Sequence, residues 1–579
     1  MTRARVIVNG GTMKKKSTSG TVPNARNMRV AYFCMEIGLR AEIPTYAGGL
    51  GILSGDVLRS SADLELGVIG ITLLYKKGYF RQRINEEGNQ TEEEVSWNPE
   101  DYLELLPQKI TVTIEGREVL VQAWLYRLQG VTGHINPVIF LDTDLSENRS
   151  DDRAITHCLY GGDYTYRLAQ EIVLGIGGVR MLEALSCTHI HKYHMNEGHS
   201  ALLTLELYRR FELYTNPLAR VRRRCVFTTH TPVASGHDQF SRDFVLRIAG
   251  SAIPEAIKNE VFTDNALNMT RLGLQMSEYF NGVAKKHGEI SRQMFPGYQI
   301  ESITNGMHAG FWASAAFCKL FDKYLPGWAA DPYSLRYVLS IPGQELWRAH
   351  MDSKTNLIGH VNKAHNAQMD AEVFTIGFAR RATAYKRGVM LFSDTEWLKQ
   401  IARKFRGIQI IYAGSAHPKD YEGKALIKQV IQKMREVKDA ISVCYIENYD
   451  INVAKLLVGG VDLWLNTPIR PQEASGTSGM KAALNGIPHF SVLDGWWLEG
   501  HIENVTGWSI GPHPDQLQGD VDKEDFEDMY NKLEYIILPI FYNQRDEWIR
   551  IMRHSIAING SFFNTHRMVQ QYVLNAYFQ

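Results

Sequence analysis

The sequence predicts an α/β protein with two doubly wound, Rossmann-like domains that face each other across a cleft. Short apolar runs, typical of buried parallel strands, alternate with segments whose apolar residues recur at helical spacing. The alternation begins near residue 30 and begins again near residue 372, which indicates that the unit is built twice. A chain of 579 residues, 44% of them apolar, is long enough for more than one well-packed core.

The first domain is expected over residues 29–370. Its apolar runs predict a long helix and four strands, at 164–186 and at 30–38, 68–75, 189–195 and 224–230. Residues 109–128 and 137–149 have the pattern of antiparallel strands and predict a small β insertion. Residues 241–371 indicate mostly helices and loops.

The second domain is expected over residues 371–579, with its last helices able to cross back to the first domain. Its strands are predicted at 372–379, 408–414, 440–447 and 461–467, and its helices at 395–407 and 423–439. Residues 1–28 hold a run of three lysines but no apolar stretch of the kind that a secretory signal needs. They are expected to form a disordered basic leader.

The bulk composition excludes several classes of protein. Lys+Arg and Asp+Glu are both 63, so the formal net charge is zero, and neither nucleic acid nor an anionic membrane is an expected partner. No apolar run reaches the length of a transmembrane helix. The six cysteines show no C-x-x-C spacing, which predicts no disulfide framework and favours the reducing cytoplasm.

Residues 473–481 (EASGTSGMK) form the most informative loop. A turn rich in glycine and hydroxyl groups leads into a helix that Lys481 is expected to open, which would make an anion cradle of free backbone N–H groups. A lysine is electrostatically unfavourable in a first helical turn unless an anion or a covalent partner lies beside it. The spacing does not match a nucleotide P-loop, because Gly479 precedes Met480 and no hydroxyl follows Lys481.

Three further loops carry polar or glycine residues. Residues 48–51 (GGLG) are one position off a dinucleotide fingerprint and lack its acidic residue, so they predict close approach to a phosphate or sugar. Residues 189–200 and 228–238 are histidine-rich but miss the H-x-x-E-H zinc spacing, so polar ligand contacts are expected and no metal. Residues 377–388 (GFARRATAYKRG) place guanidinium and ammonium groups after a strand, where an anionic substrate would bind.

No carboxylate pair suggests a glycosidase and no G-x-S-x-G motif is present, so the chain offers anion sites without an evident side-chain acid and base. Together the loops resemble those of the α-glucan (glycogen, starch, maltodextrin) phosphorylases, from about residue 29 to the end. EASGTSGMK is similar to that family's pyridoxal-phosphate signature. The resemblance implies that Lys481 holds pyridoxal 5′-phosphate as a Schiff base and that Gly476, Thr477 and Ser478 cradle its phosphate.

The other loops imply roles by the same resemblance. Three residues are expected to be catalytic, two of them binding the substrate phosphate and one lying near the glucose: Lys386, Arg381 and His230. Three are expected to bind the cofactor, Arg380 at its phosphate: Arg380, Trp312 and Tyr449. Five are expected to bind substrate, the glycines at the phosphate and the others at the sugar: Gly48, Gly49, Asn305, Glu473 and Ser475.

The family implies a glycosyltransferase of the GT-B fold, with residues 29–370 binding glucan and residues 371–579 binding the cofactor. Its reaction is phosphorolysis of α-1,4-glucan from the non-reducing end, releasing α-D-glucose 1-phosphate with retention, and the cofactor phosphate shuttles the proton. A homodimer or higher homo-oligomer is implied. The short polar stretch before the first predicted strand leads us to expect no long regulatory N-terminal region. With the GTSG and GWW sequences, this resembles the short bacterial or archaeal branch.

Two other functions compete with this interpretation. A glycogen or starch synthase shares the fold and a G-G-L loop but uses a sugar nucleotide, and it has no covalent pyridoxal, so Lys481 argues against it. A glycan-binding protein on a decayed enzyme scaffold is the second alternative. The intact Lys481, Arg381, Lys386 and His230 argue against that one.

Overall fold

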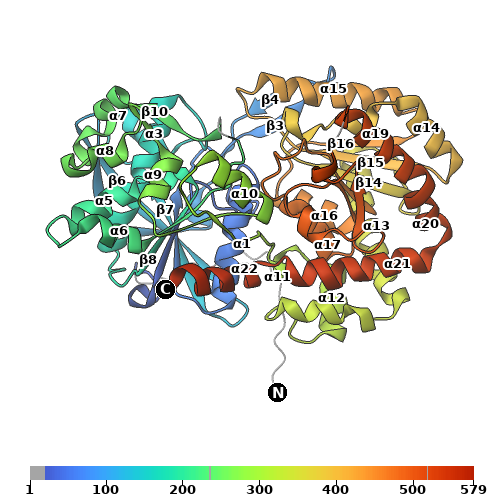
Figure 1. Ribbon diagram of the computed structural model, residues 1–579, viewed down its shortest axis with the longest axis horizontal. Coiled ribbons are helices and arrows are strands. Elements are labelled where there is room, and N and C mark those ends of the chain that lie inside the picture. Colours follow the sequence, from blue (N-terminus) through green and yellow to red (C-terminus); the bar gives the residue numbers. More distant parts are fainter. Residues whose placement is uncertain (1–19, 234–235, 518, 579) are drawn as a thin grey trace.

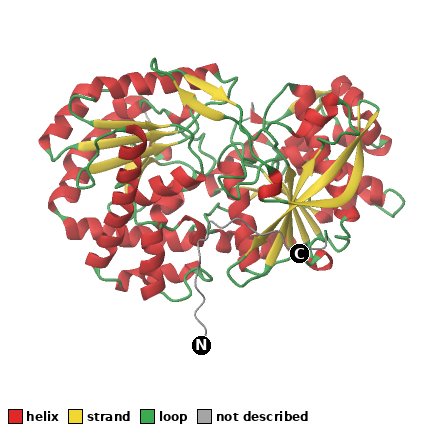
Figure 2. Ribbon diagram, turned by 180° about the vertical axis from the view of Figure 1, so that it is seen from behind, coloured by secondary structure: helices red, strands yellow, loops and turns green. Residues whose placement is uncertain are grey.

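The fold is α/β with mainly parallel sheets, as the sequence predicts. The computed structural model describes residues 20–233, 236–517 and 519–578, so most of the predicted leader lies outside the described residues. Figure 1 shows the early part of the chain around one sheet and the late part around another. Figure 2 shows the strands in two main groups, each covered by helices, with a small hairpin between them. Within the described ranges no helix is both long and apolar enough to cross a membrane.

The first sheet has nine strands in the order β13-β12-β9-β8-β1-β2-β7-β6-β5. Their bounds are β1 Val30–Phe33, β2 Val68–Leu73, β5 Glu104–Ile114, β6 Arg117–Gln129, β7 Ile135–Asp142, β8 Lys192–Asn196, β9 Cys225–Thr228, β12 Tyr279–Gly282 and β13 Glu301–Ser302. The sheet is parallel from β13 to β7, and β6 is antiparallel to both of its neighbours. The predicted β insertion therefore forms one edge of the main sheet.

The prediction for residues 241–371 was incomplete, because β12 and β13 lie there and continue the parallel sheet. These strands are four and two residues long, too short to leave a clear apolar run. A two-stranded sheet pairs β10 Gln239–Ser241, at the start of this region, with β11 Ala266–Asn268 inside it.

The second sheet has six strands, all parallel, in the order β16-β15-β14-β17-β18-β19. Their bounds are β14 Phe374–Ala379, β15 Ile408–Ala413, β16 Ser442–Ile446, β17 Leu463–Asn466, β18 His489–Val492 and β19 Gly507–Ile510. Every residue of the central strands is buried, because helices cover both faces of a parallel sheet.

The helices that border the sheets include most of those expected. Around the first sheet they are α1 Gly49–Asp63, α3 Tyr164–Ile172, α4 Gly178–Ala184, α5 Leu203–Phe211, α6 Pro217–Arg224, α7 Arg242–Ala249, α9 Met269–Gln275 and α10 Lys285–Met294. A π-helical stretch joins α3 to α4, so the long helix predicted there is confirmed. Later helices are α11 Ala309–Trp312, α12 Ala315–Tyr324, α13 Gly343–His365, α14 Thr395–Lys404, α15 Tyr421–Val437, α16 Ile451–Gly460, α17 Thr477–Leu484, α19 Val521–Lys532, α20 Leu538–Asn543, α21 Arg545–His554 and α22 Thr565–Tyr572.

The part of the chain around the first sheet is here called the first half, and the part around the second sheet the second half. Two segments connect them. The hairpin of β3 Arg81–Ile84 and β4 Gln90–Glu93 reaches the second sheet, where the Gln82 backbone N–H donates to Asn448 Oδ1 at 2.6 Å. In the other direction α22 packs on α1, and Ser60 Oγ lies 2.6 Å from Thr565 Oγ1 (Figure 1). These contacts hold the loops of the two halves in register around the candidate site.

Candidate active site

Helix α17 presents Lys481 and begins earlier than the sequence suggested. Gly476 is its N-cap, at φ +88°, and the helix starts at Thr477, so Lys481 lies in the second turn. The expectation that Lys481 opens the helix was wrong, because the left-handed conformation open to glycine lets the chain enter the helix at once. The free N–H groups of the first turn therefore belong to residues 477–479.

Lys481 is buried and sits against an aromatic ring. Its Nζ lies 4.1 Å from the centroid of Trp312, and among the described residues it forms no hydrogen bond or ion pair. Burial lowers the pKa of Lys481 to about 8, with Asp56 acting against the shift and Arg59 adding to it. With this pKa about a tenth of the amine is neutral at pH 7, far more than for an exposed lysine, which suits it to covalent chemistry with a carbonyl compound.

Helix α1 links residues 47–51, here called the glycine loop, to the surroundings of Lys481. The indole N–H of Trp312 donates to Asp56 Oδ2 at 2.7 Å, and the backbone N–H of His308 donates to the same oxygen at 3.2 Å. Asp56 stands seven residues after Gly49 on the same helix, about 10 Å along its axis. One helix thus carries the glycine loop at its start and, two turns later, Asp56, which holds the indole of Trp312.

Two buried cations converge on one carboxylate. Glu473 Oε2 accepts from Arg380 Nη2 at 2.5 Å and from Lys386 Nζ at 2.7 Å, and all three side chains are more than 90% buried. Burial alone would raise the pKa of Glu473, but Arg380 and Lys386 outweigh it and lower the pKa to about 2. The cluster keeps an excess positive charge, so it is suited to a further anion.

Asp494 is a site residue that sequence reasoning missed. Its Oδ2 accepts the backbone N–H of Glu473 at 2.8 Å, and its Oδ1 accepts that of Gly495 at 2.8 Å. Burial raises the pKa of Asp494 to about 7. Asp494 therefore fixes the backbone that carries Glu473. The available signal was an Asp-Gly pair one residue beyond a buried strand.

Buried polar atoms without partners gather around α17 and the cation cluster. In the part of the chain that the structure describes they include Ser475 Oγ, Arg380 Nη1, His489 Nε2 and Trp496 Nε1. A Cβ on Gly479 would lie 2.8 Å from the His489 ring and 2.9 Å from Trp496, so that glycine is required by packing. Several unsatisfied buried groups in one place are the pattern expected of a polar ligand site.

The glycine loop faces open space. A Cβ built on Gly48 or Gly49 meets no atom within 4 Å, whereas one on Gly55 would lie 2.0 Å from a backbone oxygen. Packing thus explains Gly55 but not the first two glycines, which leave room for a ligand. The loop borders the second half of the chain, since Tyr46 Oη accepts the backbone N–H of Ile451 at 3.2 Å, two residues after Tyr449.

Three residues expected at the site stand apart from the cation cluster. His230 Nε2 lies 2.7 Å from Asn196 Oδ1, and burial lowers the pKa of His230 to about 3. Asn305 is buried after β13, and Arg381 is exposed. Within the described residues no hydrogen bond or ion pair joins their side chains to those of the cluster. Tyr449 is half-buried. Burial raises the pKa of its phenol, and the positive charge of Arg380 acts against this shift.

A buried group elsewhere has the composition of a metal site. Ligand atoms of Asp63, His308 and His566 lie within 4.8 Å of one another. His308 Nδ1 accepts the backbone N–H of Phe311 at 3.0 Å, so the proton of the neutral ring is on Nε2, which lies 2.7 Å from Asp63 Oδ2. A metal-bound histidine would donate through its second nitrogen instead, so the group forms a hydrogen-bonded fastening between α1 and α22.

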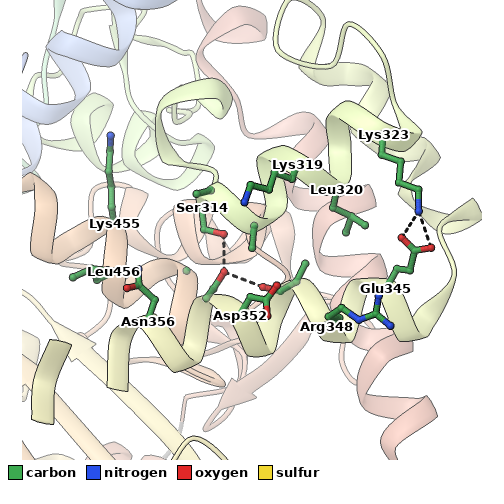
Figure 3. A pocket seen from close by; sticks show the side chains of 15 residues that line it. Ser314, Lys319, Leu320, Lys323, Glu345, Arg348, Asp352, Asn356, Lys455 and Leu456 are labelled. Carbon is green, nitrogen blue, oxygen red and sulfur yellow. Dashed lines mark hydrogen bonds and ion pairs between the residues drawn. The ribbon is translucent and has the colours of Figure 1, made fainter. Parts of the chain in front are cut away.

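A separate pocket contains none of the expected site residues. It lies among α12, α13 and α16, with a cavity volume of about 520 Å³ (Figure 3). Its charged side chains do not converge: Lys323 pairs with Glu345 at 2.7 Å, and Figure 3 shows Lys455 and Arg348 at opposite ends. We assign no catalytic role to this pocket.

The α/β fold with parallel sheets fits the phosphorylases, and comparison with known proteins defines the class. The profile of the carbohydrate phosphorylase family matches residues 255–507. The maltodextrin phosphorylase of Thermococcus litoralis is 38% identical over 94% of this chain and 70% of its own length. The glycogen phosphorylase of Aquifex aeolicus is 32% identical over 95% and 86%, and that of Mycobacterium tuberculosis 34% identical over 97% and 72%. The chain therefore belongs to the carbohydrate phosphorylase family, as its loops predicted.

Proposed function

We propose that the protein catalyses phosphorolysis of an α-1,4-glucan from its non-reducing end, releasing α-D-glucose 1-phosphate with retained configuration. The observation that carries the proposal is that the segment 473–481 holds buried Lys481 at one end and, at the other, Glu473 with the two buried cations Arg380 and Lys386. A lysine for a carbonyl cofactor and cations for phosphate are the two elements that such a reaction needs. Relatives named maltodextrin phosphorylase and glycogen phosphorylase support it.

The residues present fit pyridoxal 5′-phosphate. Lys481 offers an amine of lowered pKa beside Trp312, and the amides of Gly476, Thr477 and Ser478 form a helix N-terminus suited to a phosphate. When bound, the cofactor supplies a phosphate that titrates near neutrality and so can exchange a proton with the substrate phosphate. That chemistry would replace the acid and base that the side chains do not offer.

The remaining steps fall to the protein's own residues. Lys386 and Arg381 bind the substrate phosphate, and Arg380 binds that of the cofactor, so that the cations offset the repulsion between two phosphates. The free amides beside Gly48 and Gly49 approach the substrate phosphate from the other half of the chain. Neutral His230 and Asn305 hold the sugar.

Glu473 and Ser475 complete the sugar contacts in this proposal. A phosphate that reaches Lys386 competes with Glu473 for the same ammonium group, at present 2.7 Å away. Glu473 is then free to accept a glucose hydroxyl, as the resemblance implies. The carboxylate thus keeps the cations paired until substrate arrives.

The proposal includes a GT-B arrangement, with residues 29–370 binding glucan and residues 371–579 binding the cofactor across a shared cleft. Cytoplasmic location and a homodimer or higher homo-oligomer belong to it as predictions. Sedimentation of the purified protein tests the oligomer.

The direct test incubates the purified protein with a maltodextrin and inorganic phosphate and measures glucose 1-phosphate. We expect product that depends on both substrates and disappears in Lys481→Ala. Absence of product from protein that holds pyridoxal phosphate would refute the glucan substrate. Absence of both product and cofactor would favour the synthase or the decayed scaffold, which incorporation of glucose from a sugar nucleotide would separate.

A further inference from the structure

Glu36 lies directly behind the glycine loop and is almost fully buried. It follows β1, with 3% of its surface exposed. Its Oε2 accepts two backbone N–H groups of the loop, from Ala47 at 2.6 Å and from Gly48 at 3.0 Å. Its Oε1 accepts the phenol O–H of Tyr160 at 2.9 Å. Hydrogen bonds to an ionised acceptor are about twice as strong as neutral ones, so this carboxylate is a strong anchor for the loop.

The carboxylate also explains the last glycine of the AGGLG sequence. A Cβ on Gly51 would lie 2.7 Å from Glu36 Oε2 and 2.8 Å from Tyr46 Cβ. Any side chain there would displace Glu36 from the loop. The first two glycines leave open space in front of the loop, and Gly51 leaves room for Glu36 behind it.

The anchor is connected to the second half of the chain. The backbone oxygen of Tyr160 lies 3.0 Å from Nε2 of His417, in the loop after β15. Tyr79 packs between these two residues, its ring 6.4 Å from that of Tyr160 and 6.0 Å from that of His417. A movement of β15 and its loop would therefore shift Tyr160, the residue that donates to Glu36.

The negative charge of Glu36 is by itself unfavourable for phosphate binding at the glycine loop. A buried carboxylate beside a phosphate-binding loop repels the phosphate, and the Coulomb term opposes substrate binding. Its benefit is geometric: with Gly48 N–H engaged and the loop fixed, the first free amides of α1 keep one direction. Position and charge therefore make opposite contributions to phosphate affinity.

We propose that Glu36 is a positioning residue that holds the glycine loop in its phosphate-binding shape, and that Tyr160 and His417 couple this anchor to the second half. The proposal rests on the function proposed above. It follows that the loop binds phosphate tightly only when the two halves are in contact through Tyr160 and His417.

The kinetic test compares Glu36→Ala, Glu36→Gln and Tyr160→Phe with the wild type. In Glu36→Ala we expect KM for phosphate to rise about tenfold or more, with KM for glucan changed less than about threefold and cofactor content unchanged. Glu36→Gln, which can still accept the loop amides, should recover part of the loss. Glu42→Ala is the matched control, because Glu42 lies between β1 and α1 as Glu36 does but, among the described residues, its side chain pairs with Arg40 and with no loop amide, and it is 46% exposed.

The sign of the change decides the outcome. A fall in KM for phosphate in Glu36→Ala would overturn the proposal, because it would mean that Glu36 acts only as a nearby negative charge. An unchanged KM, or equal effects of Ala and Gln, would also overturn it.

A second measurement does not depend on activity. Amide hydrogen exchange of the peptide covering residues 44–52 should accelerate in Glu36→Ala by about tenfold or more, less in Glu36→Gln, and not in Glu42→Ala. Unchanged exchange would refute the anchor even if the wild type were inactive. A wild type without phosphorolysis but with accelerated exchange in Glu36→Ala would refute the proposed function and keep the anchor.

Discussion

Substituting Glu473 by glutamine tests whether the cation cluster exists to bind phosphate. The change removes the negative charge that Arg380 and Lys386 share and preserves the size of the side chain. A pKa lowered from 4.5 to about 2 corresponds to about 3 kcal/mol in favour of the ionised form at neutral pH. Glutamine resembles the protonated form, so the ligand-free variant should lose about that much stability, at the low end for breaking a buried ion pair.

The assay is thermal unfolding at pH 7, with and without inorganic phosphate. For a chain of this length about 3 kcal/mol lowers Tm on the order of 2–3 °C. Phosphate should raise Tm more in Glu473→Gln than in the wild type, because it no longer competes with a carboxylate for the cations. Since the pKa is lowered, the difference between the proteins is full above about pH 4.5 and shrinks as pH falls towards 2.

A matched control is Glu345→Gln, which breaks a partly exposed pair with Lys323 and should change Tm by less than about 1 °C and leave its phosphate dependence unchanged. Equal Tm values for wild type and Glu473→Gln would refute the stabilising role of the pair. An equal response of both proteins to phosphate would move the phosphate site away from Lys386.

Four further predictions address other residues. Lys481→Ala should lose bound pyridoxal phosphate and more than about a thousandfold of activity; retention of the cofactor absorbance would remove the central assignment. Arg381→Ala should raise KM for phosphate by about 10- to 100-fold, and an unchanged phosphate dependence would place that charge elsewhere. His230→Ala should lower the rate at least about tenfold with cofactor retained, and loss of cofactor would make His230 structural. Burial lowers the pKa of His194, His230 and His489 to about 3, so Tm should decline as pH falls from 6.5 towards 3, and a flat Tm would contradict this.

Local sequence patterns were sufficient for the longer apolar strands of both sheets and for a few of the helices. In the second half, the strands β14 to β17 and the helices α14 and α15 were predicted because each is a complete apolar run or helical period bounded by turn residues, whereas β18 and β19 were missed. The start of α17 was misplaced, since a glycine at φ +88° permits a helix start that its neighbours do not signal. Strands β12 and β13 were missed, because so few residues carry no period of their own.

The site divides in the same way. The motif around Lys481 and the basic residues 380–387 could be identified in the sequence because they are contiguous. Partners far apart in the chain could not: Lys386 and Glu473 are 87 residues apart, and nothing in their spacing predicts a 2.7 Å contact. Asp494 and Glu36 were missed for that reason, because each acts through backbone N–H groups that only the folded chain brings to it.

The sequence by itself determined the α/β class, the family and the identity of the residues suited to a carbonyl cofactor and to phosphate, because these follow from local periodicity and contiguous motifs. Only the tertiary structure decided how the residues act. It buries Lys481 against Trp312 and lowers its pKa, it pairs Glu473 with both cations, and it sets Glu36 behind the glycine loop. Burial and charge pairing depend on distances between segments that are remote in the chain, and such distances are set only when the two sheets and their connecting helices pack together.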